Sequence, residues 1–595
     1  MDGTEQWQQW VTAAAQVRIQ IDLPGRAVPV GRRWVHPLLV GGIAMTGPIS
    51  RKSLGRFDLA GQLLYEVEPG IDGLVLRSGK HEAVVLPSDP VTHGWLTPRV
   101  QYRTAKLEAL LNRLSELAGG PQSLWSQAES ELYKFRSFSF GRPVPDAAGG
   151  AMPLYRGNVI GDAPDSDAIL AGIEEAGRWL RQGVKSDGRF RYEYFANQDH
   201  YPDAYNDVRH AGCVYGLYFL YRLALREPAL LGDAHDTLEA AIRSAHWLYP
   251  RLRAPKGADD TGLVALVEPG GNATSGAAAL TLLSFLERPA PADVSHPALR
   301  EQLERPEDGR IVEGLGRFLL AMIDDRGKVF HNYHEMRRSD RVAEEPLYFP
   351  GEVMLALARL HRTTGDERWL DGAKRVGEAR IRRYYRERPN PDHWVMQAMW
   401  ELFDLTKDER YADVGLDMGD RHASEQFPRQ WAPFADYVGA YRRGDDVPRT
   451  TRACSRSEAM GGVVRIAWRL GADATPYEDA LLGAADHLLE NQWRPANSFY
   501  LPNPERARGA IRMGLVDNHC RIDNNQHALV GLAHALLVAR RREGTYAPPK
   551  IVLPPPPDEA EIATCRRRFS PPPQPAPTSE VEAPDAPAPA GEPTP

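Results

Sequence analysis

Residues 349–406 read FPGEVMLALARLHRTTGDERWLDGAKRVGEARIRRYYRERPNPDHWVMQAMWELFDLT, and this stretch decides the fold. It opens with a helical run that is apolar on most faces and passes through the short turn TTGDERW. A charged amphipathic helix and a polar loop follow, and then a second apolar helix. A helix that is apolar all round is buried, whereas an amphipathic helix covers a core. The stretch therefore predicts a buried helix, its outer cover and the next buried helix.

The same alternation extends in both directions from this stretch. Six apolar, small-residue-rich stretches alternate with six amphipathic ones. The apolar stretches are 208–224, 272–286, 349–365, 393–406, 457–471 and 524–538, and the amphipathic ones are 166–184, 235–252, 309–323, 367–385, 409–423 and 475–492. Buried helices that need partners on all sides fit a closed inner ring wrapped by an outer ring. We therefore predict an all-α (α/α)6 toroid over residues 166–545. An open helical solenoid is the alternative, with a more uniform repeat length.

The loops of the predicted toroid differ on its two sides. Short turns follow the apolar helices, whereas long polar and aromatic loops precede several of them, at 187–207, 324–350 and 494–525. All inner helices would then begin on the long-loop face, where their dipoles favour negative charge. We therefore expect an anionic or polyhydroxylated ligand on this face.

Polar residues of the long loops and of the first turns of the inner helices form the candidate site. Paired carboxylates can act as acid and base in glycoside hydrolysis, and Tyr and His can transfer protons. Arg binds carboxylates through its planar fork, and aromatic rings suit sugar faces. The candidate catalytic residues are Glu352, Glu458, Asp523, Tyr194, Tyr205, His210 and His527, and the candidate substrate-binding residues are Arg209, Arg456, Arg521, Trp394, Gln397, Tyr348 and His334. The alternative for each is a structural role, as in an Arg521–Asp523 bridge or a core histidine.

Two inner helix starts carry a family resemblance. With the helical pattern, YNDVRHAG (205–212) and RIDNNQHALVGL (521–532) make the chain similar to the six-hairpin glycosidase-like superfamily. YNDVRHAG and the preceding RFRYEY also look weakly like glucuronyl C5-epimerase-like domains. The resemblance implies a carbohydrate-active enzyme without a cofactor: a glycoside hydrolase, uronate epimerase or lyase acting on a saccharide or glycoconjugate. Because fold does not fix function, a non-catalytic binding or scaffold toroid stays open.

A zinc enzyme is a further alternative. Cys454 and the pair His519-Cys520 precede or open the fifth and sixth inner helices. This placement resembles the lanthionine-cyclase family, another α/α toroid, which binds zinc through two Cys and one His. Two thiolates and an imidazole would form an open catalytic zinc site.

Residues 1–141 predict a separate, small α+β domain. β-like runs lie at 17–23, 62–69, 72–79 and 81–87, and helical patterns at 98–118 and 122–135. The part from 65 to 140 resembles the AMMECR1 domain. The residues that carry this resemblance are Asp72-Gly73-Leu74, Leu86-Pro87 with Gly94-Trp95, and Trp125 with Tyr133 and Phe135. Residues 142–165 are rich in Pro, Gly and Ala, which predicts a linker.

The C-terminal residues 546–595 are rich in Pro and Ala and have few aromatic residues. Such a segment buries too little apolar surface to offset its chain entropy, so we predict a disordered tail. This tail or the N-terminal domain could recruit a protein partner.

Composition excludes several classes of protein. The net charge of −7 over 595 residues argues against a broad nucleic-acid surface. No apolar run approaches the roughly 18–20 residues of a membrane span. Four Cys make no disulfide scaffold. Because no signal-peptide pattern opens the sequence, we expect a cytoplasmic protein.

Overall fold

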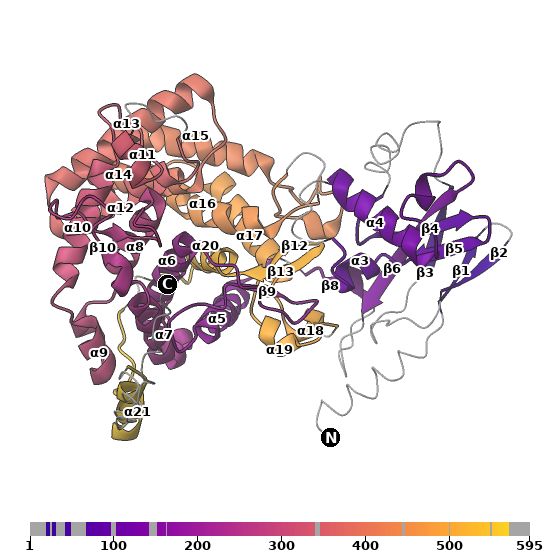
Figure 1. The fold of residues 1–595 in the computed structure, drawn as a ribbon, viewed down its shortest axis with the longest axis horizontal. Coiled ribbons are helices and arrows are strands. Elements are labelled where there is room, and N and C mark those ends of the chain that lie inside the picture. The colour runs from indigo at the N-terminus through magenta and orange to yellow at the C-terminus, as the bar shows by residue number, and fades with distance from the viewer. Residues whose placement is uncertain are drawn as a thin grey trace, which may run out of the picture.

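The computed structural model describes residues 19–23, 26–30, 42–48, 67–96, 103–141, 152–161, 163–338, 345–442, 447–498, 500–547 and 550–569. Figure 1 shows a body built on a β-sheet at one end and a larger helical body at the other. None of the described helices is both long and apolar enough to cross a membrane.

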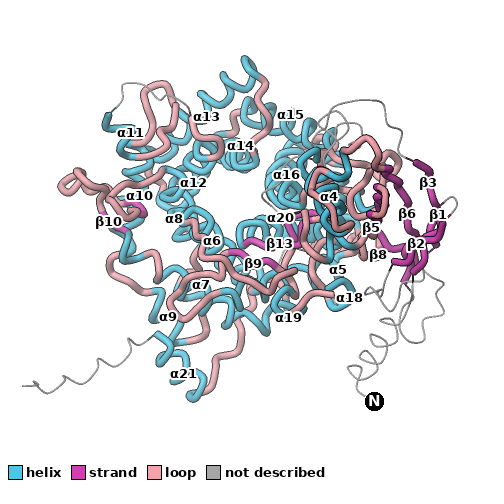
Figure 2. The backbone as a smooth tube through the Cα atoms, turned by 45° about the vertical axis from the view of Figure 1, so that its right-hand side comes forward, coloured by secondary structure: helices cyan, strands magenta, loops and turns pink. Residues whose placement is uncertain are grey.

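Six helices form an inner ring in the described part of the chain. They are α6 (Asp207–Ala224), α8 (Ser275–Glu287), α12 (Phe349–Thr364), α14 (His393–Thr406), α16 (Thr450–Leu470) and α20 (Ile522–Arg542). Each helix packs against the next, and α20 packs back against α6, so the ring is closed (Figure 2). The closed ring confirms the predicted toroid and excludes the open solenoid.

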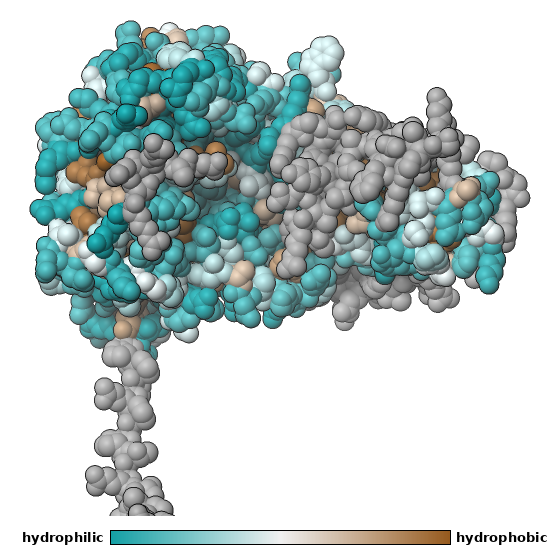
Figure 3. Space-filling model, turned by 45° about the horizontal axis from the view of Figure 1, so that its top comes forward, coloured by the Kyte–Doolittle hydropathy of each residue, from teal (hydrophilic) through white to brown (hydrophobic). Residues whose placement is uncertain are grey.

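An outer layer of amphipathic helices surrounds this ring. Its described members are α5 (Ser166–Gly183), α7 (Ala234–His246), α10 (Asp308–Ala321), α13 (Glu367–Glu387), α15 (Glu409–Glu425) and α17 (Thr475–Glu490). Short helices α9 (Pro297–Leu303), α11 (Tyr333–Arg338), α18 (Pro495–Ser498) and α19 (Pro504–Ala507), and the strand pair β10 (Leu252–Arg253) and β11 (Ala265–Leu266), lie in the connections. The outer helices present charged faces to solvent, and Figure 3 shows a largely hydrophilic surface on this body.

The inner helices approach one another closely through small residues. A Cβ atom on Gly531 of α20 would lie 2.0 Å from the hydroxyl oxygen of Ser457 on α16. A methyl group there would force two core helices apart. This contact explains why small residues recur along the apolar stretches of the sequence.

Replacing Gly531 by alanine should therefore lower the free energy of unfolding by about 1–3 kcal/mol, the usual cost of overpacking a core. Chemical denaturation of the full chain measures it. Gly309→Ala in α10 is the matched control, because a Cβ there meets nothing within 4 Å. Equal effects of the two substitutions would contradict the close packing of α16 and α20.

The N-terminal body is an antiparallel sheet covered by one helix. Its strand order is β5 (His81–Val85), β4 (Asp72–Ser78), β6 (Glu131–Gly141), β7 (Met152–Tyr155) and β8 (Asn158–Val159), and β3 (Gly42–Pro48) also pairs with β6. Strands β1 (Ile19–Leu23) and β2 (Arg26–Val30) form a separate hairpin. Helix α4 (Arg103–Leu117) packs Leu107, Leu110 and Leu114 against this sheet. The AMMECR1 resemblance stays a prediction.

Two sequence predictions are wrong in this body. Residues 122–135 form a 3-10 turn at Leu124–Ser126 and the start of β6, not a helix. The reason is that ELYKFRSFSF alternates polar and apolar residues with the period of a strand. The predicted linker 142–165 contains β7 and β8, which extend the sheet from β6. Arg156 and Gly157, both with positive φ, make the tight turn between them.

The predicted disordered tail also contains structure. Helix α21 (Glu559–Phe569) packs on the outer layer beside α9. Cys565 is buried there, and the Phe569 ring lies 5.6 Å from that of His246. Ile562, Cys565 and Phe569 follow helical spacing, so they give this charged segment one apolar face. Residues 570–595 lie outside the described residues.

A buried ion cluster joins the two bodies. Arg156, in the turn between β7 and β8, pairs with Glu68 of the N-terminal body and with Asp436 of the helical body. The Tyr437 hydroxyl donates a hydrogen bond to Glu68 over 2.6 Å. All these side chains are buried. The two bodies are therefore held at this junction by charges that water does not reach.

A short turn of the N-terminal body docks beside this cluster. It contains helix α3 (Asp89–Thr92). Val91 of α3 packs with Leu515 and Val516, which lie in the loop between strands β12 (Arg512–Gly514) and β13 (Asp517–Arg521) of the helical body. The Val91 carbonyl accepts hydrogen bonds from the side chains of Asn197 at 2.9 Å and Asn518 at 3.1 Å. The N-terminal body thus rests on the loops that lead into α6 and α20.

Candidate functional site

A small sheet organises the long loops on one face of the ring. β12 pairs with β13, and β13 pairs with β9 (Glu193–Phe195), which lies in the loop before α6. Since β13 runs directly into α20, the sheet brings the loops before α6 and α20 together (Figure 1). The start of α20 is thereby held next to the start of α6.

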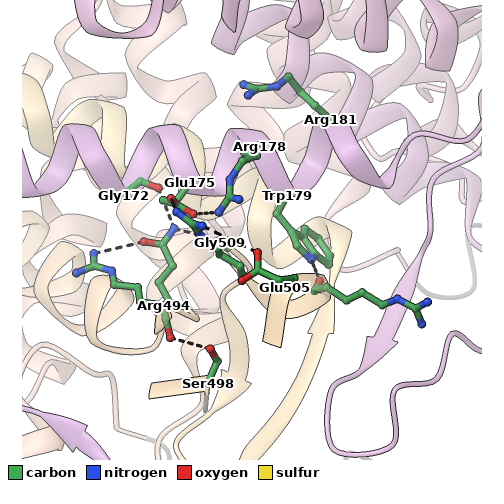
Figure 4. A network of polar contacts seen from close by, with 12 residues as sticks. Gly172, Glu175, Arg178, Trp179, Arg181, Arg494, Ser498, Glu505 and Gly509 are labelled. Carbon is green, nitrogen blue, oxygen red and sulfur yellow. Dashed lines mark hydrogen bonds and ion pairs between the residues drawn. The ribbon is translucent and has the colours of Figure 1, made fainter. Parts of the chain in front are cut away.

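The segment before β12 is fastened to outer helix α5, as Figure 4 shows. The side chain of Gln492 donates to the carbonyls of Gly172 at 2.8 Å and Gly509 at 3.0 Å. The Trp179 indole donates to the Arg506 carbonyl at 3.0 Å. These side-chain hydrogen bonds, instead of a regular strand ladder, fix the path of the chain into β12 and β13.

Candidate residues at α6 and α20 neutralise one another. Arg521 donates two hydrogen bonds to Asp523, at 2.6 and 2.8 Å, and Arg209 reaches the same carboxylate at 3.0 Å. Arg209 also donates to the Tyr192 hydroxyl. Burial opposes the charge of Asp523, but Arg521 and Arg209 hold its pKa below the ordinary value. Arg521, Asp523 and Arg209 therefore form an ion bridge between the starts of α6 and α20, in which the charge of the carboxylate is neutralised.

Three further candidates also have protein partners. His210 is fully buried, and its Nε2 donates to the Ser244 carbonyl at 2.9 Å. Its Nδ1 therefore accepts from the Tyr205 hydroxyl at 2.6 Å, and burial lowers the pKa of His210 to about 3. The Tyr194 hydroxyl donates to Asp199 at 2.9 Å, and burial with this bond raises its pKa. These contacts favour structural roles for Tyr194, Tyr205 and His210.

A glutamate–histidine pair joins α16 to α20 at the same end of the ring. The Nδ1 atom of His527 lies 2.5 Å from Oε2 of the fully buried Glu458. Burial opposes a charged imidazole, but Glu458 outweighs it and raises the pKa of His527. Since Glu458 holds Nδ1, Nε2 is the nitrogen of His527 that can meet a ligand. Glu458 thus fixes the orientation of His527 and favours its protonated form.

A second histidine, His393, lies beside His527, and its pKa is shifted in the opposite direction. The rings of His393 and His527 are 5.2 Å apart and nearly perpendicular. Burial, and then the positive charge of His527, lower the pKa of His393 well below its ordinary value. The Nε2 atom of His393 has no hydrogen-bond partner among the described residues. The site therefore presents two neighbouring imidazoles whose pKa values are shifted in opposite directions.

A buried and a partly buried carboxyl group, Glu352 and Asp392, lie at the starts of α12 and α14. Burial, and then the nearby Asp392, raise the pKa of Glu352 to about 8. Burial also raises the pKa of Asp392 to about 7, although its oxygen accepts from the backbone of Trp394 at 2.8 Å. Oε2 of Glu352 has no hydrogen-bond partner in the described chain. A Cβ on Gly276 would lie 2.7 Å from that oxygen, so glycine makes room for it.

The remaining candidates on α12 and α14 surround the histidines. Tyr348 is 45% exposed, and its ring lies 5.2 Å from that of His393. Gln397 is buried, and its Nε2 lacks a partner among the described residues. Trp394 is 2% exposed and packs against His527 at 5.7 Å. Trp394 therefore supports the histidine instead of offering the open stacking platform that the sequence suggested.

Arg456 lies with two residues that sequence reasoning missed. Its Nη2 faces Glu425 at 2.5 Å, and its guanidinium lies 4.6 Å from the centre of the Tyr441 ring. The His422 and Tyr441 rings are 6.3 Å apart, and both side chains are buried. His422 ends an amphipathic outer helix and Tyr441 lies in a loop, so neither showed a sequence signal. Asp392, also missed, was recognisable as the N-cap before His393.

His334 and the zinc alternative complete the comparison with the predicted site. His334 is on α11, and its backbone N–H donates to Asn272 at 3.3 Å, before α8. No group of three His, Cys, Asp or Glu residues in the described chain could hold a metal ion. Cys454, His519 and Cys520 do not form one, and burial raises the pKa of both thiols, that of Cys520 to about 12. The described geometry therefore does not support the zinc alternative at these three residues.

No protein-family model matches the chain, and no curated protein sequence matches it. In structure the chain is similar to a GH76 α-mannanase of Bacteroides thetaiotaomicron, with 10% identity, 64% of this chain and 97% of that chain covered, and a TM-score of 0.43. It is similar to a D-mannose isomerase, with 11% identity, 62% and 97% coverage and a TM-score of 0.41. It is also similar to an unsaturated glucuronyl hydrolase specific for heparin, with 10% identity, 64% and 98% coverage and a TM-score of 0.41. At these TM-scores the likeness says nothing of the reaction, and the closed helix ring carries the fold.

Proposed function

We propose that this protein is a carbohydrate-active enzyme that transfers protons on a saccharide, as an epimerase or lyase does. The observation that carries the proposal is the pair His393 and His527. The pKa of His393 is lowered and that of His527 is raised, and their rings lie 5.2 Å apart. Pairs of titratable groups with opposed pKa shifts supply the acid and the base of proton-transfer enzymes.

The proposed reaction begins at a carbon–hydrogen bond next to a carbonyl or carboxyl group. Neutral His393 accepts the proton at Nε2, and the electron pair of the broken bond moves onto the neighbouring oxygen. His527 donates a proton from Nε2, either to the carbon or to a leaving oxygen. The first route exchanges the carbon-bound hydrogen with solvent, and the second gives an unsaturated sugar. Glu458 stabilises the protonated form of His527 before donation, and its contact with Nδ1 keeps the ring in the same orientation afterwards.

The surroundings of the histidines support a hydroxyl-rich substrate. The side-chain amide of Gln397 and the carboxyl group of Glu352 are buried, and each has an atom without a partner in the described chain. Buried polar groups are usually hydrogen-bonded, so such atoms are suited to sugar hydroxyls. Tyr348 stands exposed at the rim, where its ring can pack on a sugar face.

Deuterium exchange tests this proposal directly. The full chain is incubated in D2O with neutral and acidic saccharides, and carbon-bound deuterium is measured by NMR and mass spectrometry. We expect exchange in the wild type and in His361→Asn, since His361 lies in the last turn of α12, at the opposite end of that helix. Loss of exchange in His393→Asn would support the mechanism. No exchange with any saccharide, and no thermal protection by one, would favour a scaffold.

The dependence of activity on pH should follow from the directions in which the pKa values of His393 and His527 are shifted. His527 must be protonated to donate, so activity should fall as pH rises through its pKa, above the ordinary value near 6.5. His393 must be neutral to accept, and its lowered pKa keeps it so well into the acid range. We expect a plateau at weakly acidic pH and a fall at a pH above the ordinary histidine value, measured as exchange rate against pH. A rate that climbs steadily through neutrality would contradict these roles.

Glycoside hydrolysis is a second candidate, which the pKa of Glu352 favours. A carboxyl group with a pKa of about 8 is protonated at neutral pH and can serve as a general acid. Release of reducing ends without deuterium in the sugar carbons would identify this reaction.

A further inference from the structure

Buried hydrogen-bond donors gather beside the histidine pair, where α16 begins. Arg456 keeps one guanidinium nitrogen, Nη1, without a partner among the described residues. The hydroxyl of the fully buried Tyr441 likewise has none there. His422 is 1% exposed, and neither ring nitrogen makes a hydrogen bond of ordinary geometry in the described chain. Its ring lies near the Pro391 backbone.

These groups form one cluster, which also borders the site. The guanidinium of Arg456 lies over the Tyr441 ring, and that ring lies next to His422. The positive charge of Arg456 acts on both His393 and Tyr348. Helix α16, which carries Arg456, packs against α14, which begins at His393, so the cluster lies on the side of the proposed base.

The charge of the cluster selects the kind of ligand. Burial, and then the positive charges of Arg456, Arg421 and Arg452, lower the pKa of His422. Glu425 balances Arg456 through Nη2 only. Leaving buried donors unmatched is costly, and an ionised carboxylate accepts several hydrogen bonds at once. An anionic acceptor fits this cluster better than a hydroxyl group does.

From these contacts we propose that Arg456 and Tyr441, which lie beside His422, form a subsite for the carboxylate of an acidic sugar. The inference rests on the proposed function and names its substrate class as hexuronates. A carboxylate held there would lie beside His393. The hydrogen on the carbon that bears a carboxyl group is acidified by it, which is the bond that the proposed base attacks.

Matched sugar pairs test the subsite. Binding of glucuronate, galacturonate and mannuronate is compared with that of glucose, galactose and mannose by calorimetry on the full chain. We expect the wild type to bind at least one hexuronate about tenfold or more tightly than its neutral partner. Acetate alone should bind weakly, which separates a sugar-borne carboxylate from a free anion.

Single-group variants give the decisive comparison. Tyr441→Phe removes one hydroxyl group and should lower hexuronate affinity about 3–10-fold while neutral-sugar affinity stays unchanged. Tyr411→Phe, a buried tyrosine on α15 packed against Gly377, is the control and should change neither. Arg456→Met should remove the preference for acid.

Three results would overturn the subsite. They are equal binding of acidic and neutral sugars by the wild type, equal losses for both classes in Tyr441→Phe, and acetate bound as tightly as a hexuronate. Deuterium exchange in neutral sugars would then leave the proposed function standing while this inference fails. Absence of any saccharide binding would remove both.

Discussion

Replacing His527 by asparagine should lower the rate of deuterium exchange by about 10²–10⁴-fold, the usual contribution of a positioned acid or base. Asparagine can still accept or donate at the position of Nδ1, so the contact with Glu458 is kept in part. It cannot deliver a proton at neutral pH. The measurement is exchange under saturating saccharide, with binding followed separately by calorimetry.

The variant Glu458→Gln tests the effect of Glu458 on the protonation of His527 apart from its effect on the placement of the ring. Glutamine keeps the shape of Glu458, which lies 2.5 Å from Nδ1, but removes the negative charge that raises the pKa of His527. The alkaline fall of the profile should move to lower pH in this variant. If His527→Asn exchanges at the wild-type rate, His527 is not the acid and the proposed reaction is wrong.

Replacing Arg156 by methionine should cost about 3–5 kcal/mol of unfolding free energy, because the change leaves buried charges without their partner. Glu68 and Asp436 approach the same guanidinium, and the side chains of all three residues are at most 5% exposed. Methionine fills a similar volume, so lost packing contributes little. Chemical denaturation of the full chain, followed by both tryptophan fluorescence and circular dichroism, measures the loss.

A surface ion pair provides the control for this prediction. Arg113 of α4 pairs with Glu116 at 2.9 Å, and their side chains are 45% and 37% exposed. Exposed pairs contribute about 0–1 kcal/mol, so Arg113→Met should change little. Comparable losses in Arg156→Met and Arg113→Met would mean that the buried cluster does not hold the two bodies together.

The toroid could be predicted from the sequence because the burial of a helix determines which residue types it contains. Helices enclosed on all sides, such as α8 with SGAAALTLLSFLE, lack a charged face, and covering helices such as α13 show one. Elements with less contrast were misread. β6 alternates with the period of a strand, but its many charged and aromatic residues concealed this. In α21 one apolar stripe was hidden among Pro-rich neighbours.

The composition of the site could be predicted, but the pairing of its charges could not. Spacing placed Arg209, Arg456 and Arg521 alike at inner helix starts. Only the contacts show that Asp523 neutralises Arg209 and Arg521, whereas Arg456 keeps a nitrogen without a partner in the described chain. The raised pKa of His527 likewise depends on Glu458, which lies 69 residues from His527 in the chain. Partners brought together by ring closure leave no local trace in sequence.

The α3 turn has a consequence for how this molecule can be divided. Val91 covers Leu515 and Val516 at the tip of the hairpin that continues into α20, the helix of His527. A toroid excised from the N-terminal body would bare this apolar tip to water and release the hairpin on that side. The N-terminal body therefore stabilises the helical body, and the two should be expressed and engineered together as one chain.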